Sequence, residues 1–200
     1  MPGEPVMAAA PFLFGKLPAH GDFVARGLAL SAQDAWDVWA SREIEAAREA
    51  LAARFDAAHD QAAPLRFICG PGPLGEGWRA GAAAPSIDSA GRRFIVLMGV
   101  EALDEAAAAS LGVAIADRCE LAIRRALIDT MAADPVLEAL ADAAPTPGEK
   151  AVAGAVQATI PDGGVWWRDA EEGIDRGAAP PEGLLRRALE AAMLGGWGNG

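Results

Sequence analysis

The chain of 200 residues has no tyrosine, two cysteines and two histidines, and these scarcities exclude several classes of protein. Cys69 and Cys119 lie far apart in apolar segments, which suits buried, reduced thiols better than a disulfide framework or a redox pair. His20 and His59 stand in neither an HxH nor an HExxH spacing, so a zinc site is not expected. We therefore predict no metal or other cofactor, and a reducing compartment, the cytoplasm.

The chain also lacks a long apolar run and an excess of positive charge. No window approaches the ~18 apolar residues that a membrane helix requires, and the short, broken N-terminal run makes a poor signal peptide. The formal net charge is -11 and the basic residues are scattered among acids, so a polyphosphate backbone would be repelled. The sequence predicts a protein that inserts into no membrane and binds no nucleic acid.

Hydrophobic residues make up 52% of the chain, enough for one core of ordinary size. We expect a single domain over residues 10–194, between flexible ends at residues 1–9 and 195–200. The segment AAPTPGEK, residues 143–150, is the best linker candidate. The stretch of chain after this segment is too short for an independent second domain.

Apolar residues recur at helical spacing after Ser31, and Ser31 with Asp34 has the form of a capping box. This pattern predicts one long amphipathic helix over residues 31–57. We expect the opposite face to be solvated, with a mixture of charges from Arg42, Glu43, Glu45, Arg48, Glu49 and Arg54.

Strand-like segments occur at residues 65–70, 77–87 and 92–101, and the turns between them are too short to hold a crossover helix. Further strands are predicted at residues 10–17 and 163–169. Helical patterns recur after Leu103, from Asp134 to Leu140, and over residues 180–193. The expected fold class is α+β, with a mostly antiparallel sheet of about four to six strands packed against long amphipathic helices.

The segment GPGPLG, residues 70–75, has the glycine spacing of a dinucleotide-binding loop. In such a loop the third glycine opens a helix that receives the pyrophosphate. Here two prolines stiffen the loop and a strand-like segment comes next, so we interpret it as a tight connection between strands.

The segment FGKLPAHGDF, residues 14–23, gathers charged residues around two glycines and a proline. The glycines and proline suit a tight turn, and Asp22 is able to accept hydrogen bonds from nearby amides. Lys16, Arg26 and Arg92 are available as partners of Asp22 or Asp88. Such pairs would tie this turn to the later turn PSIDSAGR.

Three interpretations of these turns stay open: a turn-stabilising network, a surface recognised by a partner, and a site of chemistry. The last would be a small hydrolase or ligand-binding domain that uses His20, Asp22, Ser86 and Asp88, since a nucleophile requires an adjacent base. No GxSxG motif supports it, and a turn is the simpler role for Ser86.

Six tryptophans stand out in a chain without tyrosine. Trp36 and Trp39 lie on the apolar stripe of the first helix, and we expect both in the core. Trp166 and Trp167 are adjacent in a predicted strand and so point to opposite faces. We expect one to be buried and the other to face solvent, a second layer or a partner; the alternative is that the last helix covers both.

Taken together, five segments resemble the TagF/ImpM family of proteins associated with type VI secretion. That family has a GKLPxxGDF opening, a WDxW helix, an RF strand, a PSxDxxGRxF segment and a later WW. The matching segments are FGKLPAHGDFVARGL (residues 14–28), WDVW (36–39), LRFICG (65–70), GWRAGAAAPSIDSAGRRF (77–94) and VWW (165–167). The combination of the first and fourth motifs is more specific than any single one.

The resemblance implies a non-enzymatic cytoplasmic regulator that represses assembly of the secretion machine after translation by binding a forkhead-associated scaffold protein. It leaves a homodimer open. We expect the interface to include an exposed aromatic such as Trp166 or Trp167 and polar residues of the two turns. The candidate interaction residues are Lys16, His20, Asp22, Phe23, Arg26, Trp36, Asp37, Trp39, Ser86, Asp88, Arg92, Trp166 and Trp167.

Overall fold

The computed structural model describes residues 10–72, 74–103, 105–142, 163–168, 175–176, 180 and 182–195. Residues 1–9 and 196–200, for which we predicted flexible ends, lie outside the described residues, and so does the linker candidate at residues 143–150. Gly195, which we assigned to the C-terminal end, is the last residue of a helix.

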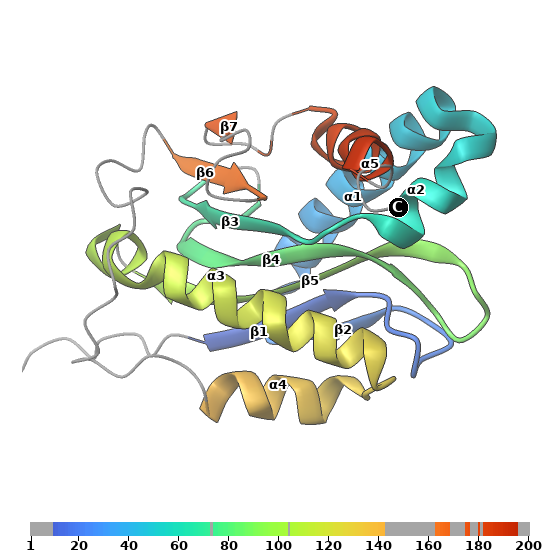
Figure 1. Ribbon diagram of the computed structural model, residues 1–200. Helices are drawn as coiled ribbons and strands as arrows, with labels where there is room; N and C mark the ends of the chain where they lie inside the picture. Colours follow the sequence, from blue (N-terminus) through green and yellow to red (C-terminus); the bar gives the residue numbers. More distant parts are fainter. Residues whose placement is uncertain are drawn as a thin grey trace, which may run out of the picture.

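A seven-stranded sheet crosses the molecule in the order β2-β1-β5-β4-β3-β6-β7, and every neighbouring pair is antiparallel (Figure 1). The number of strands exceeds the expected four to six because short strands, β2 and β7, form the two edges. The strands are β1 (Ala10–Gly15), β2 (Val24–Arg26), β3 (Leu65–Cys69), β4 (Trp78–Ile87), β5 (Arg93–Leu103), β6 (Gly164–Trp167) and β7 (Asp175–Arg176).

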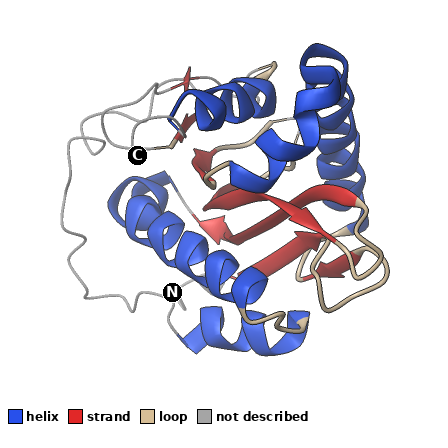
Figure 2. Ribbon diagram, turned by 45° about the vertical axis from the view of Figure 1, so that its right-hand side comes forward, coloured by secondary structure: helices blue, strands red, loops and turns tan. Residues whose placement is uncertain are grey.

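Helices cover both faces of this sheet (Figures 1 and 2). Helices α1, α2 and α5 pack on one face, and α3 and α4 pack on the other. Their bounds are α1 (Leu30–Leu51), α2 (Phe55–Gln61), α3 (Glu105–Ile128), α4 (Ala133–Asp142) and α5 (Leu184–Gly195), with a short 3₁₀ turn at Ala52–Arg54. The α+β class and the single-domain architecture are confirmed. None of the described helices has the length and apolarity needed to cross a membrane.

The predicted helix over residues 31–57 starts within one residue of the expected position, but its capping box and its C-terminal end are wrong. Helix α1 begins at Leu30, its N-cap is Ala29, and no side chain caps it, so Ser31 lies inside the helix rather than in a capping box. At the other end Ala52 has a φ of 45°, and the chain turns through Ala52–Arg54 into α2. Phe55, which the apolar periodicity placed in the core, is buried as predicted, but it belongs to α2 and not to α1.

The loop at residues 70–75 joins β3 to β4 as a tight turn. Gly72 and Gly75 exchange main-chain hydrogen bonds of 2.9 and 3.0 Å, and strand β4 begins at Trp78. No helix comes after the third glycine, so the loop lacks the helix N-terminus on which a dinucleotide site depends. The interpretation as a connection between strands is confirmed.

Candidate functional site

The turn after β1 and the turn between β4 and β5 meet at one end of the sheet, because β1 and β4 both pair with β5. We call residues 16–23 and 86–92 together the turn junction. Across it, the main-chain N–H of Ser89 donates to the carbonyl of His20 at 2.8 Å, and Ser86 Oγ donates to the carbonyl of Lys16 at 2.7 Å. The predicted meeting of the two glycine-bearing turns is confirmed.

Asp88 is the centre of the turn junction. Its Oδ2 accepts from Lys16 Nζ at 2.9 Å and from Arg92 Nε at 2.7 Å. Its Oδ1 accepts from the main-chain N–H groups of Ala90 at 3.0 Å and Arg92 at 2.9 Å. Asp88 is 1% exposed, and a buried carboxylate requires hydrogen-bond partners for both of its oxygens. These four hydrogen bonds supply them, and the one from Lys16 ties the turn after β1 to the turn between β4 and β5.

Burial raises the pKa of Asp88, but the hydrogen bonds from Lys16 and from the main chain and side chain of Arg92 outweigh it and hold the pKa well below its usual range. Because the pKa is lowered, Asp88 is ionised at neutral and mildly acidic pH. The charge pairs of the turn junction therefore persist through that range.

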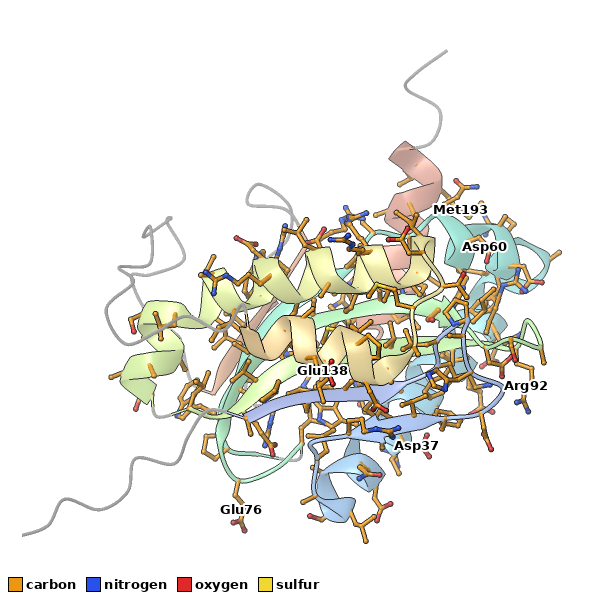
Figure 3. All side chains as sticks on the ribbon, turned by 90° about the horizontal axis from the view of Figure 1, so that it is seen from below. Asp37, Asp60, Glu76, Arg92, Glu138 and Met193 are labelled. Atoms are coloured by element: carbon orange, nitrogen blue, oxygen red, sulfur yellow. The ribbon has the colours of Figure 1, made fainter. Side chains whose placement is uncertain are left out.

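Arg92 closes the junction from the solvent side. Besides pairing with Asp88, its Nη2 donates to the carbonyl of Gly21 at 2.6 Å, and its side chain is 58% exposed (Figure 3). The predicted clamp of opposite charges is confirmed. Asp88, and not Asp22, is the partner of both Lys16 and Arg92. Asp22 is exposed at the tip of its turn, where it accepts the main-chain N–H of its neighbour Phe23 at 2.8 Å.

Two other predicted residues of the first turn attach it to helix α4. The Nε2 of His20 accepts the main-chain N–H of Ala133 at 3.0 Å, and Arg26 Nε donates to Asp134 Oδ1 at 2.7 Å. Arg26 therefore pairs with neither Asp22 nor Asp88. Asp134, where the predicted helical pattern starts, lies within the first turn of α4, which begins at Ala133.

These contacts commit three residues of the alternative hydrolase site to the fold, and the fourth, Asp22, lies at the exposed tip of its turn. The hydroxyl proton of Ser86 goes to a main-chain carbonyl, and the ring nitrogen of His20 that accepts a hydrogen bond faces α4. Asp88 is paired with two cations. Nucleophilic catalysis requires the hydroxyl to reach a base, and among the described residues no such contact joins Ser86 to His20.

Phe23 gives the turn junction an exposed apolar group. Its ring stacks on Phe14 at 6.0 Å and meets Phe94 edge-on at 4.8 Å, and Lys16 Nζ lies 5.2 Å from its centre. The side chain is still 45% exposed. Of the predicted candidates in this region, Asp22, Phe23, Arg26 and Arg92 reach the surface.

The WDVW motif divides between core and surface. Trp36 is fully buried, Trp39 is half-buried, and Asp37 is exposed on α1 (Figure 3). Trp36, Trp39 and Trp166 lie within 6.2 Å of one another by ring centres, and Phe67 completes the cluster.

Trp166 and Trp167 are 0% and 4% exposed, so neither provides the surface aromatic that we expected. They point to opposite faces, as strand geometry predicted, and each reaches its own packed layer. Trp166 lies under α1 and α5, and Trp167 lies on the face covered by α3. Both faces of β6 are covered by helices, which is the reason the expected exposed aromatic is wrong.

Glu43 was assigned to the solvated face of the first helix, and this too is wrong. Its carboxylate is buried and accepts the main-chain N–H groups of Gly183 at 2.9 Å and Leu185 at 2.8 Å. It thereby caps the N-terminus of α5 from α1. No local sequence signal identifies this role, because the two partners are about 140 residues apart along the chain.

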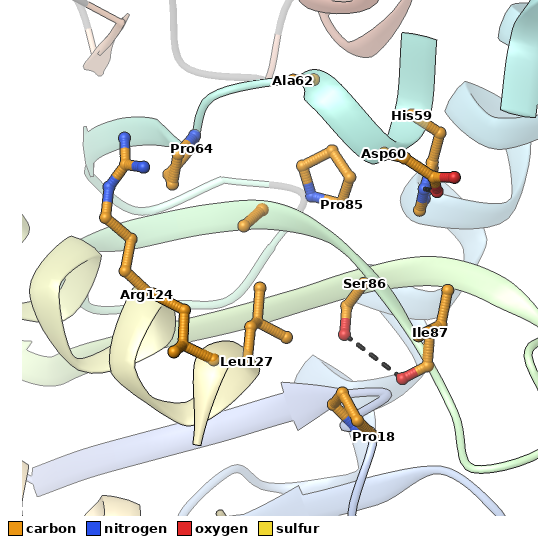
Figure 4. Close-up of a pocket in the computed structure, with 12 residues that line it drawn as sticks. Pro18, His59, Asp60, Ala62, Pro64, Pro85, Ser86, Ile87, Arg124 and Leu127 are labelled. Carbon is orange, nitrogen blue, oxygen red and sulfur yellow. Dashed lines mark hydrogen bonds and ion pairs between the residues drawn. The ribbon is translucent and has the colours of Figure 1, made fainter. Parts of the chain in front are cut away.

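A cavity of about 320 Å³ lies beside the turn junction, between α2, β4 and the end of α3 (Figure 4). Pro18, Pro64 and Pro85 line it, with His59 at one edge (Figure 4). Burial lowers the pKa of His59, and its Nε2–H donates to the carbonyl of Phe94 at 2.7 Å. The described residues contain no group of three or more His, Cys, Asp or Glu side chains placed to hold a metal ion.

Comparisons with known proteins extend this description. The family model of the TagF N-terminal domain, described as type VI secretion system-associated, matches residues 13–146. Among solved structures, the crystal structure of PA0076 from Pseudomonas aeruginosa PAO1 superposes with a TM-score of 0.69 at 23% identity, over 90% of this chain and 93% of that chain. At this identity the likeness concerns the fold. A search of curated proteins gives no match.

Proposed function

Because the chain belongs to the family of TagF N-terminal domains, which are associated with type VI secretion, we propose that it is a non-enzymatic regulator of that system. It represses assembly of the secretion machine after translation, in the cytoplasm, by binding a forkhead-associated scaffold protein. The observation that carries the proposal is the family match over residues 13–146.

The geometry of the turn junction supports a binding role rather than catalysis. Its buried polar groups satisfy one another, whereas a catalytic site keeps a nucleophile and a base free for substrate. Around them the junction presents Asp22, Phe23 and Arg92, an exposed aromatic beside charged groups. Aromatic and arginine side chains commonly contribute the largest share of binding energy in protein interfaces.

The test is recovery of the scaffold with the tagged chain from a lysate of the source cells, followed by measurement of binding with the two purified proteins. A repressor further predicts that overproduction lowers type VI secretion and that deletion raises it. The proposal is abandoned if the purified proteins do not bind and neither manipulation changes secretion.

A matched pair of variants separates recognition from folding. Phe23→Ser removes an exposed ring of the junction, and Leu121→Ser removes a more exposed apolar side chain on α3. If the junction contacts the scaffold, the first variant weakens binding while the second leaves it unchanged, with both proteins folded by circular dichroism.

A further inference from the structure

A groove of about 730 Å³ runs along the side of α1 that faces the segment before α5. One wall is α1, with Asp34, Val38 and Arg42 on successive turns and Trp39 next to Val38. The other wall is Pro180 and Glu182, with Leu74 completing the described lining. We call this the α1–α5 groove. Its volume falls in the range of sites that bind small molecules or a few side chains of a partner.

The walls of the groove are fixed to each other by Glu43. This carboxylate of α1 accepts the main-chain N–H groups of Gly183 and Leu185, so Gly183, next to Glu182, and the first turn of α5 are held against α1. A groove whose walls are tied in this way is largely pre-formed, and binding then requires little ordering of the protein.

The chemistry of the groove is apolar with a negative rim. Val38 is 49% exposed and lies beside the half-buried Trp39, so the two side chains offer an apolar surface to a ligand in the groove. Asp34 and Glu182 are exposed and form no ion pair with a described residue, and Arg42 is the one basic side chain among the described residues of the lining. The whole chain adds a net charge of -11 to this local field.

From these observations we infer that the α1–α5 groove binds a basic segment of the scaffold protein. An arginine or lysine side chain lays its alkyl part against Val38 and Trp39 and pairs its charged end with Asp34 or Glu182. An acidic or phosphate-bearing ligand would meet two carboxylates that form no ion pair with any described residue. The identity of the partner rests on the proposed function, whereas the preference for positive charge rests on the groove alone.

The first test reverses one charge of the rim. Asp34→Lys is expected to weaken binding of the purified scaffold about tenfold, mainly through a slower association rate, with a smaller salt dependence than the wild type. The matched control is Glu138→Lys, which makes the same change of net charge on α4, at the other face of the sheet (Figure 3). It is expected to stay within about twofold of the wild type, since rim charges act chiefly at short range in salt.

The second test removes the apolar contact without adding charge. Val38→Asn is expected to weaken binding about fivefold, because it removes an apolar contact from the wall of the groove without introducing a repulsive charge. Ile128→Asn, on α3, is its control. Equal effects of Asp34→Lys and Glu138→Lys, together with equal effects of the two asparagine variants, would overturn the inference.

A peptide experiment separates failure of this inference from failure of the proposed function. If the wild-type chain does not bind the scaffold, the proposed function fails, and the groove is judged with the capped peptide acetyl-Leu-Arg-Leu-Arg-amide. Titration into the ¹⁵N-labelled chain is expected to shift the indole N–H signal of Trp39, identified by its loss in Trp39→Phe, and Asp34→Lys is expected to abolish the shift. An unmoved Trp39 signal, or an equal shift in Asp34→Lys, sinks the inference.

Discussion

The turn junction and the α1–α5 groove both contain carboxylates beside aromatic rings, but they use the carboxylates differently. In the junction, Asp88 is buried and has two cations and two main-chain N–H groups as partners. In the groove, Asp34 and Glu182 are exposed and unpaired among the described residues. A charge whose partners lie within the chain stabilises the fold, and a charge without such partners is available to another molecule.

Both regions include residues of the motifs that resemble the family, since Val38 and Trp39 of the WDVW motif line the groove, so the motifs mix two roles. Lys16, Asp88 and Arg92 maintain the fold, while Phe23 and Trp39 border surfaces that are open to contact. Variants that distinguish stability from binding therefore test the comparison directly, and the buried junction should show the largest effect.

Asp88→Asn is expected to give the largest loss of stability. The substitution keeps the shape of the side chain but leaves Lys16 Nζ buried without its counter-ion, and breaking a buried pair in this way is strongly destabilising. We expect the melting temperature to fall by about 10 °C, measured by differential scanning calorimetry.

The matched control for that variant is Asp22→Asn in the opposite turn. Asp22 is exposed, and its side chain accepts a hydrogen bond from the main-chain N–H of the next residue. The melting temperature of the Asp22→Asn variant is therefore expected to stay within about 2 °C of the wild type. Equal losses in the two variants would show that Asp88 has no special place in the junction.

Glu43→Ala is expected to have the next largest effect, because it removes both acceptors from the N-terminus of α5. The loss of a helix cap together with buried hydrogen bonds costs about 2 kcal/mol. Urea unfolding measures it, and Glu43→Gln, which keeps one acceptor, is expected to lose less. If alanine costs no more here than at the exposed Glu45 of the same helix, the carboxylate does not hold α5.

Much of the fold could be predicted from the sequence because its signals are local. Apolar periodicity placed α1 and α3, and short glycine- and proline-rich turns required β3, β4 and β5 to pair antiparallel. The same logic put the rings of Trp166 and Trp167 on opposite faces. It did not show that helices cover both faces, because the covering helices are distant in sequence.

The sequence predicted that charge pairs join the two turns, but it did not show which aspartate makes them. The turns offered Asp22 and Asp88 as acceptors for the same cations, and only the pairing of β4 and β1 with β5 selects Asp88. Glu43 lies in a run of charged residues that is typical of a solvated face. Its role depends on the N-terminus of α5, which no helical periodicity in α1 reveals.

A smaller, pH-dependent effect is expected at His59, beside the cavity of Figure 4. Burial lowers the pKa of His59 in the folded chain, so below its unfolded value of about 6.5 the unfolded chain binds more protons. Stability is therefore expected to fall as pH drops from 7.5 to 5.5. His59→Gln keeps a donor for the carbonyl of Phe94 but does not titrate, and its stability is expected to fall less over this range.

Urea unfolding at several pH values gives the comparison, and the difference between the wild type and His59→Gln isolates the contribution of this one ring. Two parallel curves would mean that the imidazole is charged equally easily in both states. That outcome would contradict its burial against β5.

The smallest effect is expected where the turn junction meets α4, at the exposed pair of Arg26 and Asp134. Both side chains are largely in solvent, so water screens their attraction and Arg26→Ala should cost only about 0.5 kcal/mol. The loss should vanish at about 1 M salt, where the screening length is near 3 Å. His20 lies beside this pair and bonds α4 through the main-chain N–H of Ala133, a contact that salt does not screen. A cost for Arg26→Ala that persists in salt would show that the Arg26 side chain holds α4 by packing or by hydrogen bonding that salt does not screen, and not by the attraction of its charge to Asp134.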